Sequence, residues 1–235
     1  GIERIKSPTL DKVETSINNS KIKANSEDII IEEYIDGQLY SHSAVIKDNS
    51  IIEDFFIKED NSKGYFHVDT SCVADNLETG IINGIRREVN LIIRKLSLTS
   101  GIFHTQFIRK GSNFYLLECT RRCPGDLYSL LVKLSTGYNF AKSYLSSFIN
   151  ESIYQYKNQE KYIIRHTIYD DSGLFSSLNF KYPVKLVSFY PLISTFELAS
   201  TRGKRVAICF FESETLEEHN NLYKIIMERK LYEFD

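Results

Sequence analysis

The sequence predicts an α+β fold, and three observations lead to this class. Residues Gly101–Arg109 alternate strictly between two faces, and the β-rich run Phe114–Cys119 follows after a glycine-containing turn, which is the pattern of a β-hairpin. A second pair of strand-like runs, Gln38–Lys47 and Ile51–Lys58, is also adjacent in the chain. Between the two pairs, apolar residues recur at helical spacing from residue 77 to residue 96. We therefore expect a sheet built from hairpins and covered by a long helix.

Length and charge limit the class of protein. The chain has 235 residues, enough for one large domain or two small ones with a substantial buried core. Its 29 basic and 31 acidic side chains give a net charge of −2, so charge provides no argument for a nucleic-acid or membrane partner. No apolar run approaches the ~20 residues of a membrane span, and no signal-peptide pattern is present. We expect a cytoplasmic protein.

The cysteines favour the same compartment. Cys72, Cys119, Cys123 and Cys209 show no C-x-x-C spacing, so reduced and mostly buried thiols are favoured over a zinc site or a disulfide framework. The chain does not begin with Met, and we expect a processed chain or a piece of a longer one.

The N-terminal region predicts a helix followed by a strand. Ser7 and Pro8 are residue types favoured at the N-cap and the first helical position, and apolar residues follow at helical spacing up to Ile17. The polar run Asn18–Ser26 predicts a loop. Asp28–Gly37, DIIIEEYIDG, is an apolar run that ends in acids and a glycine, and by periodicity it is a buried strand that reaches the surface.

The next hundred residues predict the body of the sheet. Asp48-Asn49-Ser50 is expected to join the first two strands in a hairpin, and Tyr65–Thr70 is expected to be another strand. Asp75–Glu78 has the pattern of a capping box and would open the long helix. The apolar stripe of this helix includes Leu77, Ile81, Ile85, Val89, Ile92 and Leu96. We interpret this stripe as core that covers the sheet.

The most informative stretch is the hairpin of residues 101–119. If its loop is the three residues Gly111–Asn113, Gln106 falls directly opposite Glu118, with their Cβ atoms ~5 Å apart on one face. A two-residue turn would break this facing pattern. An amide oxygen and a carboxylate held side by side suit Mg²⁺, which prefers oxygen ligands and phosphate partners.

Arginines and a turn follow the hairpin directly. Arg121 and Arg122 precede Pro124-Gly125-Asp126, a turn that exposes backbone N–H groups, and arginine forks bind phosphate oxygens bidentately. Metal ligands, arginines and a glycine turn within about twenty residues point to polyphosphate chemistry. The alternative is a solvated strand end in which Glu118 forms a salt bridge. Residue types alone leave both interpretations open.

A family resemblance rests on the same stretch. His104-Thr105-Gln106-Phe107 and Leu117-Glu118-Cys119-Thr120-Arg121-Arg122-Cys123-Pro124-Gly125-Asp126 resemble the metal-binding hairpin of the ATP-grasp ligases, H-T-E-F, a turn, then I-E-x-N-x-R-x-x-G-D. The resemblance implies that Gln106 and Glu118 bind Mg²⁺, or Mn²⁺ in its place, and that Arg122 is the catalytic arginine that holds phosphate or acyl phosphate. Gln106 matches the carbamoyl-phosphate-synthase-like branch. Thr120 occupies the position of a metal-binding Asn and departs from the pattern. His104 shares a strand face with Gln106 and is a minor cofactor-binding candidate.

The run Asp28–Gly37 also resembles a family motif, the hinge V-E-E-Y-I-x-G that passes behind the adenine of ATP. The resemblance implies that Glu32 lies near the adenine amino group, and that the backbone of Glu33 and Ile35 binds the adenine. Where the family has a Glu that holds the ribose, this chain has Leu39.

Helices and a smaller module are expected in the last part of the chain. Leu127–Leu134 and Phe140–Phe148 predict two helices, for which Asp126 and Asn139 are plausible N-caps; Asp126 is as plausible in a structural role as in the site. After a polar linker, short strands are expected at Tyr162–Tyr169, Lys185–Phe189 and Arg205–Phe211, and Thr215-x-x-Glu218 would open a final helix. The isolated histidines His42, His67, His166 and His219 are interpreted as structural.

The resemblance also implies the organisation and activity of the protein. Residues 1–36 would belong to the small ATP-grasp lobe, 37–150 to the large lobe, and 151–235 to a small β-rich module packed on it, with a mostly antiparallel sheet in each lobe. The implied activity is an ATP- and Mg-dependent ligase that activates a carboxylate as an acyl phosphate for attack by an amine.

The family's two phosphate-binding lysines have no counterpart here, because Lys6 and Lys12 fall after the loop that should follow them. We expect a C-terminal piece of a larger ligase whose N-terminal lobe comes from the same polypeptide, with small-molecule partners and a homodimer as one assembly. The alternative, supported by Leu39, Thr120 and the absent lysines, is a non-catalytic nucleotide-binding or interaction module.

Overall fold

The structure is a computed structural model that describes residues 3–64, 67–149, 156, 158–170, 177–193 and 204–234. The chain divides into two compact units, Gly1–Asp36 and Gly37–Asp235. None of the helices in the described ranges is long and apolar enough to cross a membrane. The four cysteines are free; Cys72 and Cys209 are buried as expected, whereas Cys123 is partly exposed and Cys119 is exposed, so the prediction of mostly buried thiols holds for two of the four.

The described part of the smaller unit contains the helix α1 (Leu10–Ala24). This helix does not begin after Ser7 as predicted, because Ser7 has a positive φ of 52° and turns the chain. It also continues through most of the polar run 18–26, where we expected a loop, and it ends at Asn25 in the left-handed conformation. Two basic residues, Lys21 and Lys23, lie in its last turn, where they interact favourably with the helix dipole.

The segment Asp28–Gly37 is neither helix nor strand, so the prediction of a buried strand was wrong. Ile30 and Ile31 within it are 85% and 67% exposed. A strand needs a neighbouring strand to pair its backbone N–H and C=O groups, and residues 3–36 contain no other strand.

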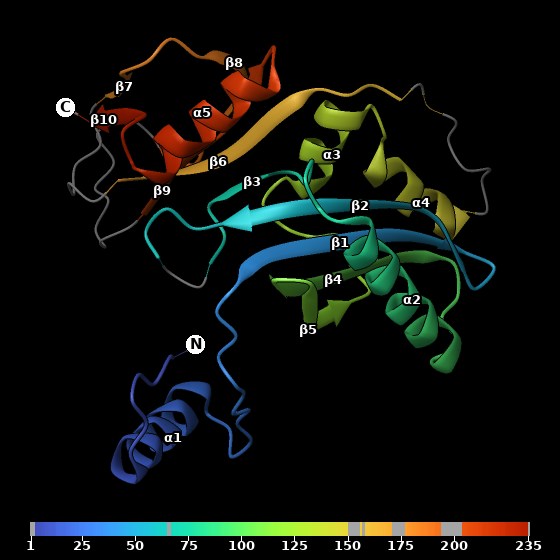
Figure 1. Cartoon of the computed structure of the whole chain (residues 1–235), viewed down its shortest axis with the longest axis vertical. Coiled ribbons are helices and arrows are strands. Elements are labelled where there is room, and N and C mark those ends of the chain that lie inside the picture. Colours follow the sequence, from blue (N-terminus) through green and yellow to red (C-terminus); the bar gives the residue numbers. More distant parts are fainter. Residues whose placement is uncertain are drawn as a thin grey trace. The chain divides into compact units, whose positions relative to one another are not determined.

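The larger unit is built on one antiparallel sheet (Figure 1). In the described residues it has eight strands in the order β5-β4-β1-β2-β3-β6-β9-β8. Their bounds are β1 (Gln38–Lys47), β2 (Ser50–Asp60), β3 (Thr70–Val73), β4 (Gly101–Lys110), β5 (Asn113–Thr120), β6 (Tyr162–Asp170), β8 (Lys185–Pro191) and β9 (Lys204–Ser213). The short strands β7 (Leu178–Phe180) and β10 (Tyr232–Phe234) pair separately.

Two connections in the sheet differ from the sequence prediction. β2 begins at Ser50, so the turn before it is the pair Asp48-Asn49, both with positive φ, as a two-residue hairpin turn requires. The third strand was expected at 65–70 but β3 begins at Thr70, and the described residues 67–69 are not in a strand. The reason is local: the buried carboxylate of Asp69 accepts hydrogen bonds from the backbone N and the hydroxyl of Ser62, which holds this segment in a loop.

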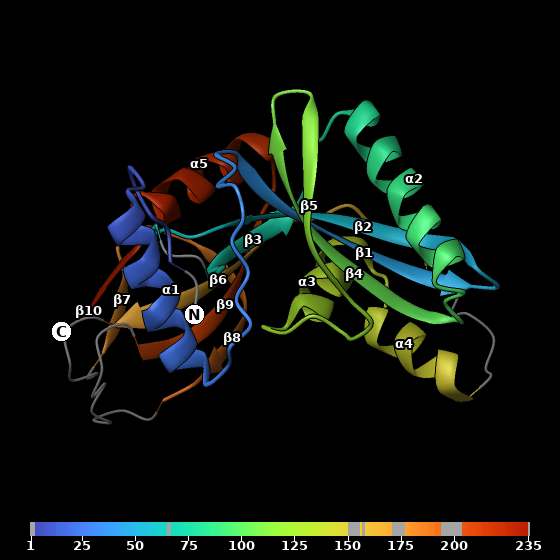
Figure 2. The same ribbon diagram turned by 90° about the horizontal axis from the view of Figure 1, so that it is seen from below.

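Helices cover both faces of the sheet (Figure 2). α2 (Thr79–Lys95) and α5 (Leu216–Met227) lie on one face, and α3 (Tyr128–Thr136) and α4 (Phe140–Ile149) lie on the other. Of the predicted stripe of α2, Ile81, Ile85 and Val89 are buried, whereas Ile92 is only partly buried and its neighbour Ile93 lies in the core instead. Leu96 was also expected in the stripe but is 64% exposed, because the helix ends at Lys95.

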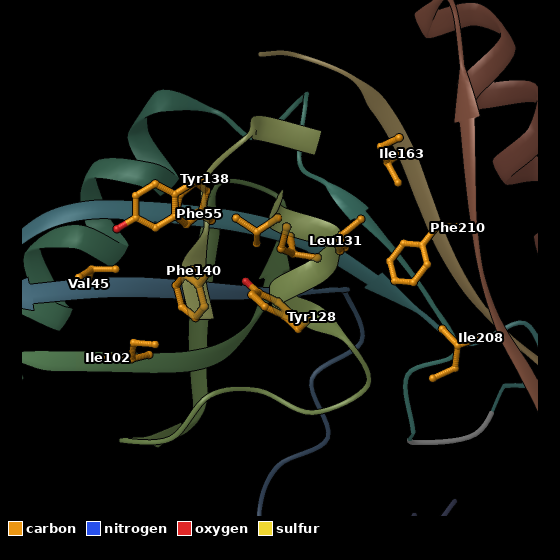
Figure 3. Packing of buried hydrophobic residues seen from close by; sticks show 12 residues of the cluster. Val45, Phe55, Ile102, Tyr128, Leu131, Tyr138, Phe140, Ile163, Ile208 and Phe210 are labelled. Carbon is orange, nitrogen blue, oxygen red and sulfur yellow. The ribbon is translucent and has the colours of Figure 1, made fainter. Parts of the chain in front are cut away.

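The core under α3 and α4 positions the site. Val45, Phe55, Ile57 and Ile102 of the sheet pack against the helices and the loop between them (Figure 3). The ring of Tyr138 lies 5.0 Å from that of Phe55, centroid to centroid. This apolar contact fixes α3, and therefore the turn that precedes it, over β1, β2 and β4 on the face of the sheet that α3 and α4 cover.

Helix caps show which local signals were reliable. The side chain of Asn139 accepts a hydrogen bond from Lys142 N at 3.0 Å, and that of Thr215 accepts one from Glu218 N at 3.2 Å, both as predicted. The capping box at Asp75–Glu78 does not form: α2 begins after Glu78, which makes no side-chain cap.

Strands from the last third of the chain extend the same sheet. β6 pairs with β3, β9 with β6, and β8 with β9, and α5 packs on β6 and β9 through Tyr223 and Ile226. The polar linker expected from residue 151 lies mostly outside the described residues. The domain boundary at residue 150 stays a prediction.

Candidate functional site

The face of the sheet under α3 changes from apolar to polar along its strands. On β4, Ile102 is followed on the same face by His104 and Gln106, and on β2, Ile57 is followed by Glu59. The apolar ends pack under α3 and α4, whereas the polar ends line a cavity of about 270 Å³. Because side chains alternate between the two faces of each strand, the polar side chains of β2 and β4 lie together on the face under α3, at the cavity.

Gln106 and Glu118 lie directly opposite each other on β4 and β5, as predicted, but for a different reason. The loop is the two-residue turn Gly111-Ser112, since β4 ends at Lys110 and β5 begins at Asn113. The register shifts beyond Gln106, where Leu117 is the extra residue of a β-bulge. A bulge adds one residue to a strand, and one added residue reverses the face on which the following side chains lie. The bulge at Leu117 therefore restores the facing of Gln106 and Glu118 that the two-residue turn would have broken. The predicted three-residue loop was wrong.

The carboxylate of Glu118 forms no salt bridge within the described residues. Arg109 pairs with Glu78, and Arg121 donates to the carbonyl oxygens of Thr99 and Ser100 at the start of β4. Among the residues that the structure describes, the side chain of Arg122 donates one hydrogen bond, to the carbonyl oxygen of Cys123 at 3.3 Å. The alternative of a structural salt bridge at Glu118 is therefore not what the structure shows.

Glu59 is a site residue that sequence reasoning missed. The side-chain N of Gln106 donates to Glu59 Oε2 at 2.7 Å, which turns the amide oxygen of Gln106 away from Glu59 and leaves it available for a ligand. Burial raises the pKa of the Glu59 carboxyl, and the charge of Glu118 raises it further, against the hydrogen bond from Gln106. The signal in the sequence was an acid at the end of the apolar face of β2.

The side chains of Gln106, Glu118 and Glu59 fit a hard divalent cation. Within the described ranges, the Glu118 carboxylate and the amide oxygen of Gln106 lie side by side without a partner, and the buried carboxyl of Glu59 is adjacent. Among the described residues there is no group of three or more His, Cys, Asp or Glu side chains arranged to hold a metal. Mg²⁺ does not need one, because it commonly binds one or two carboxylates and fills its remaining positions with water and phosphate oxygens.

His104 and Thr120 face each other across the same strand pair and also line the cavity. His104 is 7% exposed, and its Nδ1 is 2.7 Å from the hydroxyl of Ser43. Burial, with the charges of His42 and Arg122, lowers the pKa of His104 to about 4. Its imidazole is therefore neutral near pH 7 and acts as a hydrogen-bonding group rather than a cation.

The turn after β5 brings Arg122, Pro124 and Gly125 to the cavity. Asp126 is not the N-cap of α3: it has a positive φ of 55°, and Leu127 takes the cap position, also in the left-handed conformation. The carboxylate of Asp126 forms ion pairs with Arg165 and Arg205 instead. The predicted N-cap role was therefore wrong, and Asp126 also lines the cavity.

A second cavity residue that the sequence did not reveal is Arg165, on β6. Its side chain is 2% exposed, and it reaches the site because β3 aligns Ser71 with both Glu59 and Arg165. No local pattern predicts this, since the sheet order decides it.

The three hinge residues Glu32, Glu33 and Ile35 lie in the smaller unit, in chain that is neither helix nor strand. Glu32 and Glu33 are exposed and Ile35 is partly buried. Their assignment to the adenine stays a prediction.

No protein-family model matches the sequence, and no curated protein matches it. Solved structures do. Phosphoribosylglycinamide synthetase from Anaerococcus prevotii is similar over 97% of this chain and 60% of its own, with a TM-score of 0.71 and 16% identity. L-amino acid ligase from Bacillus licheniformis is similar over 100% of this chain and 65% of its own, with a TM-score of 0.76 and 16% identity.

A third similar structure is the biotin carboxylase domain of 2-oxoglutarate carboxylase from Hydrogenobacter thermophilus, solved with MgADP and bicarbonate. It is similar over 96% of this chain and 52% of its own, with a TM-score of 0.69 and 12% identity. The chain thus spans about half to two thirds of these proteins. At such identities the likeness establishes the fold, which is the ATP-grasp fold of these ligases.

Proposed function

We propose that this chain binds Mg-ATP and an acyl phosphate as part of a ligase that joins a carboxylate to an amine. The proposal rests on one observation: Gln106 and Glu118 lie side by side at the cavity, no arginine in the described part of the chain pairs with Glu118, and Arg122 lies at the same cavity. Support comes from the shared fold, because one similar structure is an L-amino acid ligase and another contains MgADP and bicarbonate.

Gln106, Glu118 and the hydroxyl of Thr120 are the proposed ligands of Mg²⁺, or of Mn²⁺ in its place. The bound cation supplies neutralising charge for the β- and γ-phosphates. Glu59 contributes indirectly, because its hydrogen bond to the Gln106 amide fixes which end of that amide faces the cavity. His104 is neutral and can exchange a hydrogen bond with a bound phosphate or carboxylate.

In the proposed reaction, a carboxylate oxygen of the acid attacks the γ-phosphorus of ATP. The bond from that phosphorus to the β,γ-bridging oxygen breaks, and ADP leaves. The nitrogen of the amine then attacks the acyl carbon, phosphate leaves, and the nitrogen loses a proton. Arg122 can hold two oxygens of the transferred phosphoryl group in a planar fork and so stabilise its developing charge.

The remaining assignments belong to the same proposal. Glu32 and the backbone of Glu33 and Ile35 would bind the adenine. Residues 1–36 would belong to the small lobe, 37–150 to the large lobe and 151–235 to a C-terminal module. The partners are small carboxylate and amine substrates.

A second candidate function is nucleotide binding without catalysis. The observation in its favour is that a hydroxyl, Thr120, lines the cavity where an amide would supply a stronger oxygen ligand. Leu39 adds to it, as an apolar side chain where a ribose-binding acid would be expected. ADP formation in the presence of mixed carboxylic acids and amines separates the two functions, since only the ligase releases ADP when both substrates are present.

The test of the proposed function is the variant Glu118→Gln. It keeps the shape of the side chain and removes one exposed charge, so Mg-dependent ATP binding should weaken by about tenfold to a hundredfold, as expected for a lost charged contact. The melting temperature should stay nearly constant. Calorimetric titration with ATP, with and without Mg²⁺, measures the first quantity.

The matched control is Glu78→Gln, because Glu78 forms an ion pair with Arg109 and does not line the cavity. It should leave the affinity for Mg-ATP unchanged. Two results contradict the proposal: wild-type protein that binds ATP no better with Mg²⁺ than without it, or a Glu118→Gln protein that binds Mg-ATP normally but melts several degrees lower.

A further inference from the structure

Arg165 is a buried arginine whose hydrogen bonds are incomplete. Its Nε donates to the carbonyl oxygen of Asp126 at 2.6 Å, and its Nη2 donates to the hydroxyl of Thr167 at 2.8 Å. The Asp126 carboxylate lies 3.5 Å from Nη2. The third nitrogen, Nη1, makes no hydrogen bond or ion pair with a described residue. A guanidinium that is 2% exposed and lines a cavity therefore keeps two N–H donors for a ligand.

The neighbouring charges do not neutralise this group. Asp126 is 38% exposed and shares its carboxylate between Arg165 and Arg205. Glu59 also lines the cavity, but its carboxylate accepts a hydrogen bond from Gln106 and forms no ion pair with Arg165 within the described residues. A buried cation is stabilised when an anion completes its hydrogen bonds, so this part of the cavity favours a negatively charged ligand group.

The position of Arg165 separates it from the metal pair. Gln106 and Glu118 lie on β4 and β5, whereas Arg165 lies on β6, and β1, β2 and β3 are between them. Phosphates bound by the cation would occupy the β4–β5 side. The anion at Arg165 is then a different group from the phosphates and belongs to another substrate.

We infer that Arg165 binds a carboxylate of a small-molecule substrate, at the side of the cavity opposite Gln106 and Glu118, and that it selects substrates by this group. The inference rests on the proposed function for the location of the phosphates. Two sources can supply the carboxylate: a second carboxylate of the acid that is activated, or the carboxylate of an amino acid that serves as the amine.

Matched pairs of small molecules test the inference. The dicarboxylates malonate, succinate and glutarate are compared with their monoamides, and the common L-amino acids with their amides, each titrated calorimetrically with and without Mg-ADP. Wild-type protein should bind the carboxylate member of one series about tenfold to a hundredfold more tightly than the amide. The series that shows the difference identifies the source of the carboxylate.

Three variants assign the preference to Arg165. Arg165→Met should bind both members of a pair equally. Arg165→Lys keeps the charge opposite Asp126 but should lose most of the preference for the carboxylate over the amide, because an ammonium cannot anchor to Asp126 and Thr167 and also reach the ligand. Arg205→Met is the matched control: it removes the other partner of Asp126, and Arg205 does not line the cavity. It should keep the wild-type preference.

The results separate the inference from the proposed function. Mg-ADP affinity without any acid should fall in Glu118→Gln and change less than about twofold in Arg165→Lys. Normal, Glu118-dependent binding of Mg-ADP without a carboxylate preference in either series overturns the inference alone. Equal loss of preference in Arg165→Lys and Arg205→Met also overturns it, since the effect would then come from the ion-pair cluster and not from Nη1.

Discussion

Replacing Asp54 by asparagine tests how the sheet is fixed to α2. Asp54 lies on β2 and is 8% exposed. Arg86 of α2 donates to both of its oxygens, each at 2.7 Å, and Nε2 of His42 is 3.0 Å from Oδ2. Burial alone would raise the pKa of Asp54, but these hydrogen bonds and charges outweigh it and lower the pKa to about 2.

The pKa gives the magnitude. A decrease from 3.8 to about 2 corresponds to about 2.5 kcal/mol in favour of the folded protein, at roughly 1.4 kcal/mol per pKa unit. Because the pKa is lower in the folded state, this stabilisation is fully present above pH 3.8 and is lost as the pH falls towards 2. Asp54→Asn should therefore lower the free energy of unfolding by about 2.5 kcal/mol at neutral pH, and by progressively less as the pH falls from 3.8 towards 2.

Urea denaturation at a series of pH values, followed by circular dichroism, measures both effects. Glu78→Gln is the control, because the Glu78–Arg109 pair is more exposed and such pairs contribute below about 1 kcal/mol. The reasoning is refuted if the two variants lose equal stability at neutral pH, or if the loss in Asp54→Asn does not change between pH 3.8 and 2.

Two further predictions concern the hairpin and the turn after it. Deleting Leu117 removes the extra residue of the β-bulge and leaves Glu118 opposite Gln106 in a regular ladder, so Mg-dependent ATP binding should be retained in calorimetry and the strand pairing should survive in circular dichroism; loss of binding would contradict this register. Arg122→Lys should reduce ligase turnover at least tenfold, because an ammonium cannot replace the planar fork of the guanidinium. Arg121→Lys should lower thermal stability and leave turnover unchanged, since Arg121 donates to backbone carbonyls at the start of β4. Equal losses of turnover in the two variants would show that the two roles are misassigned.

The elements that could be predicted from sequence are those for which local pattern and burial agree. The side chains of β1 and β4 alternate between the two faces of the sheet, and α2 has an apolar stripe at helical spacing. In each element the apolar side chains pack against a helix or the sheet, as its pattern predicts. The segment Asp28–Gly37 has the same apolar character but no strand beside it in residues 3–36, and its structure therefore depends on what surrounds it.

The same distinction applies to the site. Gln106 and Glu118 are neighbours in one hairpin, and their pairing was predicted only because two errors cancel: the expected loop was one residue too long, and the bulge at Leu117 was not foreseen. Glu59 and Arg165 come together only because β3 lies between their strands. Glu59 stands between Lys58 and Asp60, and Arg165 stands beside His166, so no periodicity distinguishes either of them from a structural charge.

β3 also has a consequence for the order of folding. β1–β2 and β4–β5 are closed by two-residue turns, whereas the contact of Thr70 on β3 with His166 on β6 joins residues 96 positions apart. Each doubling of loop length adds about 0.6 kcal/mol to the entropic cost of closing the loop. Closing the loop between β3 and β6 therefore costs about 3 kcal/mol more than closing either hairpin, and this pairing forms after them. The cavity needs this pairing, because Arg165 is on its far side. A ligand held there would thus slow unfolding without accelerating folding.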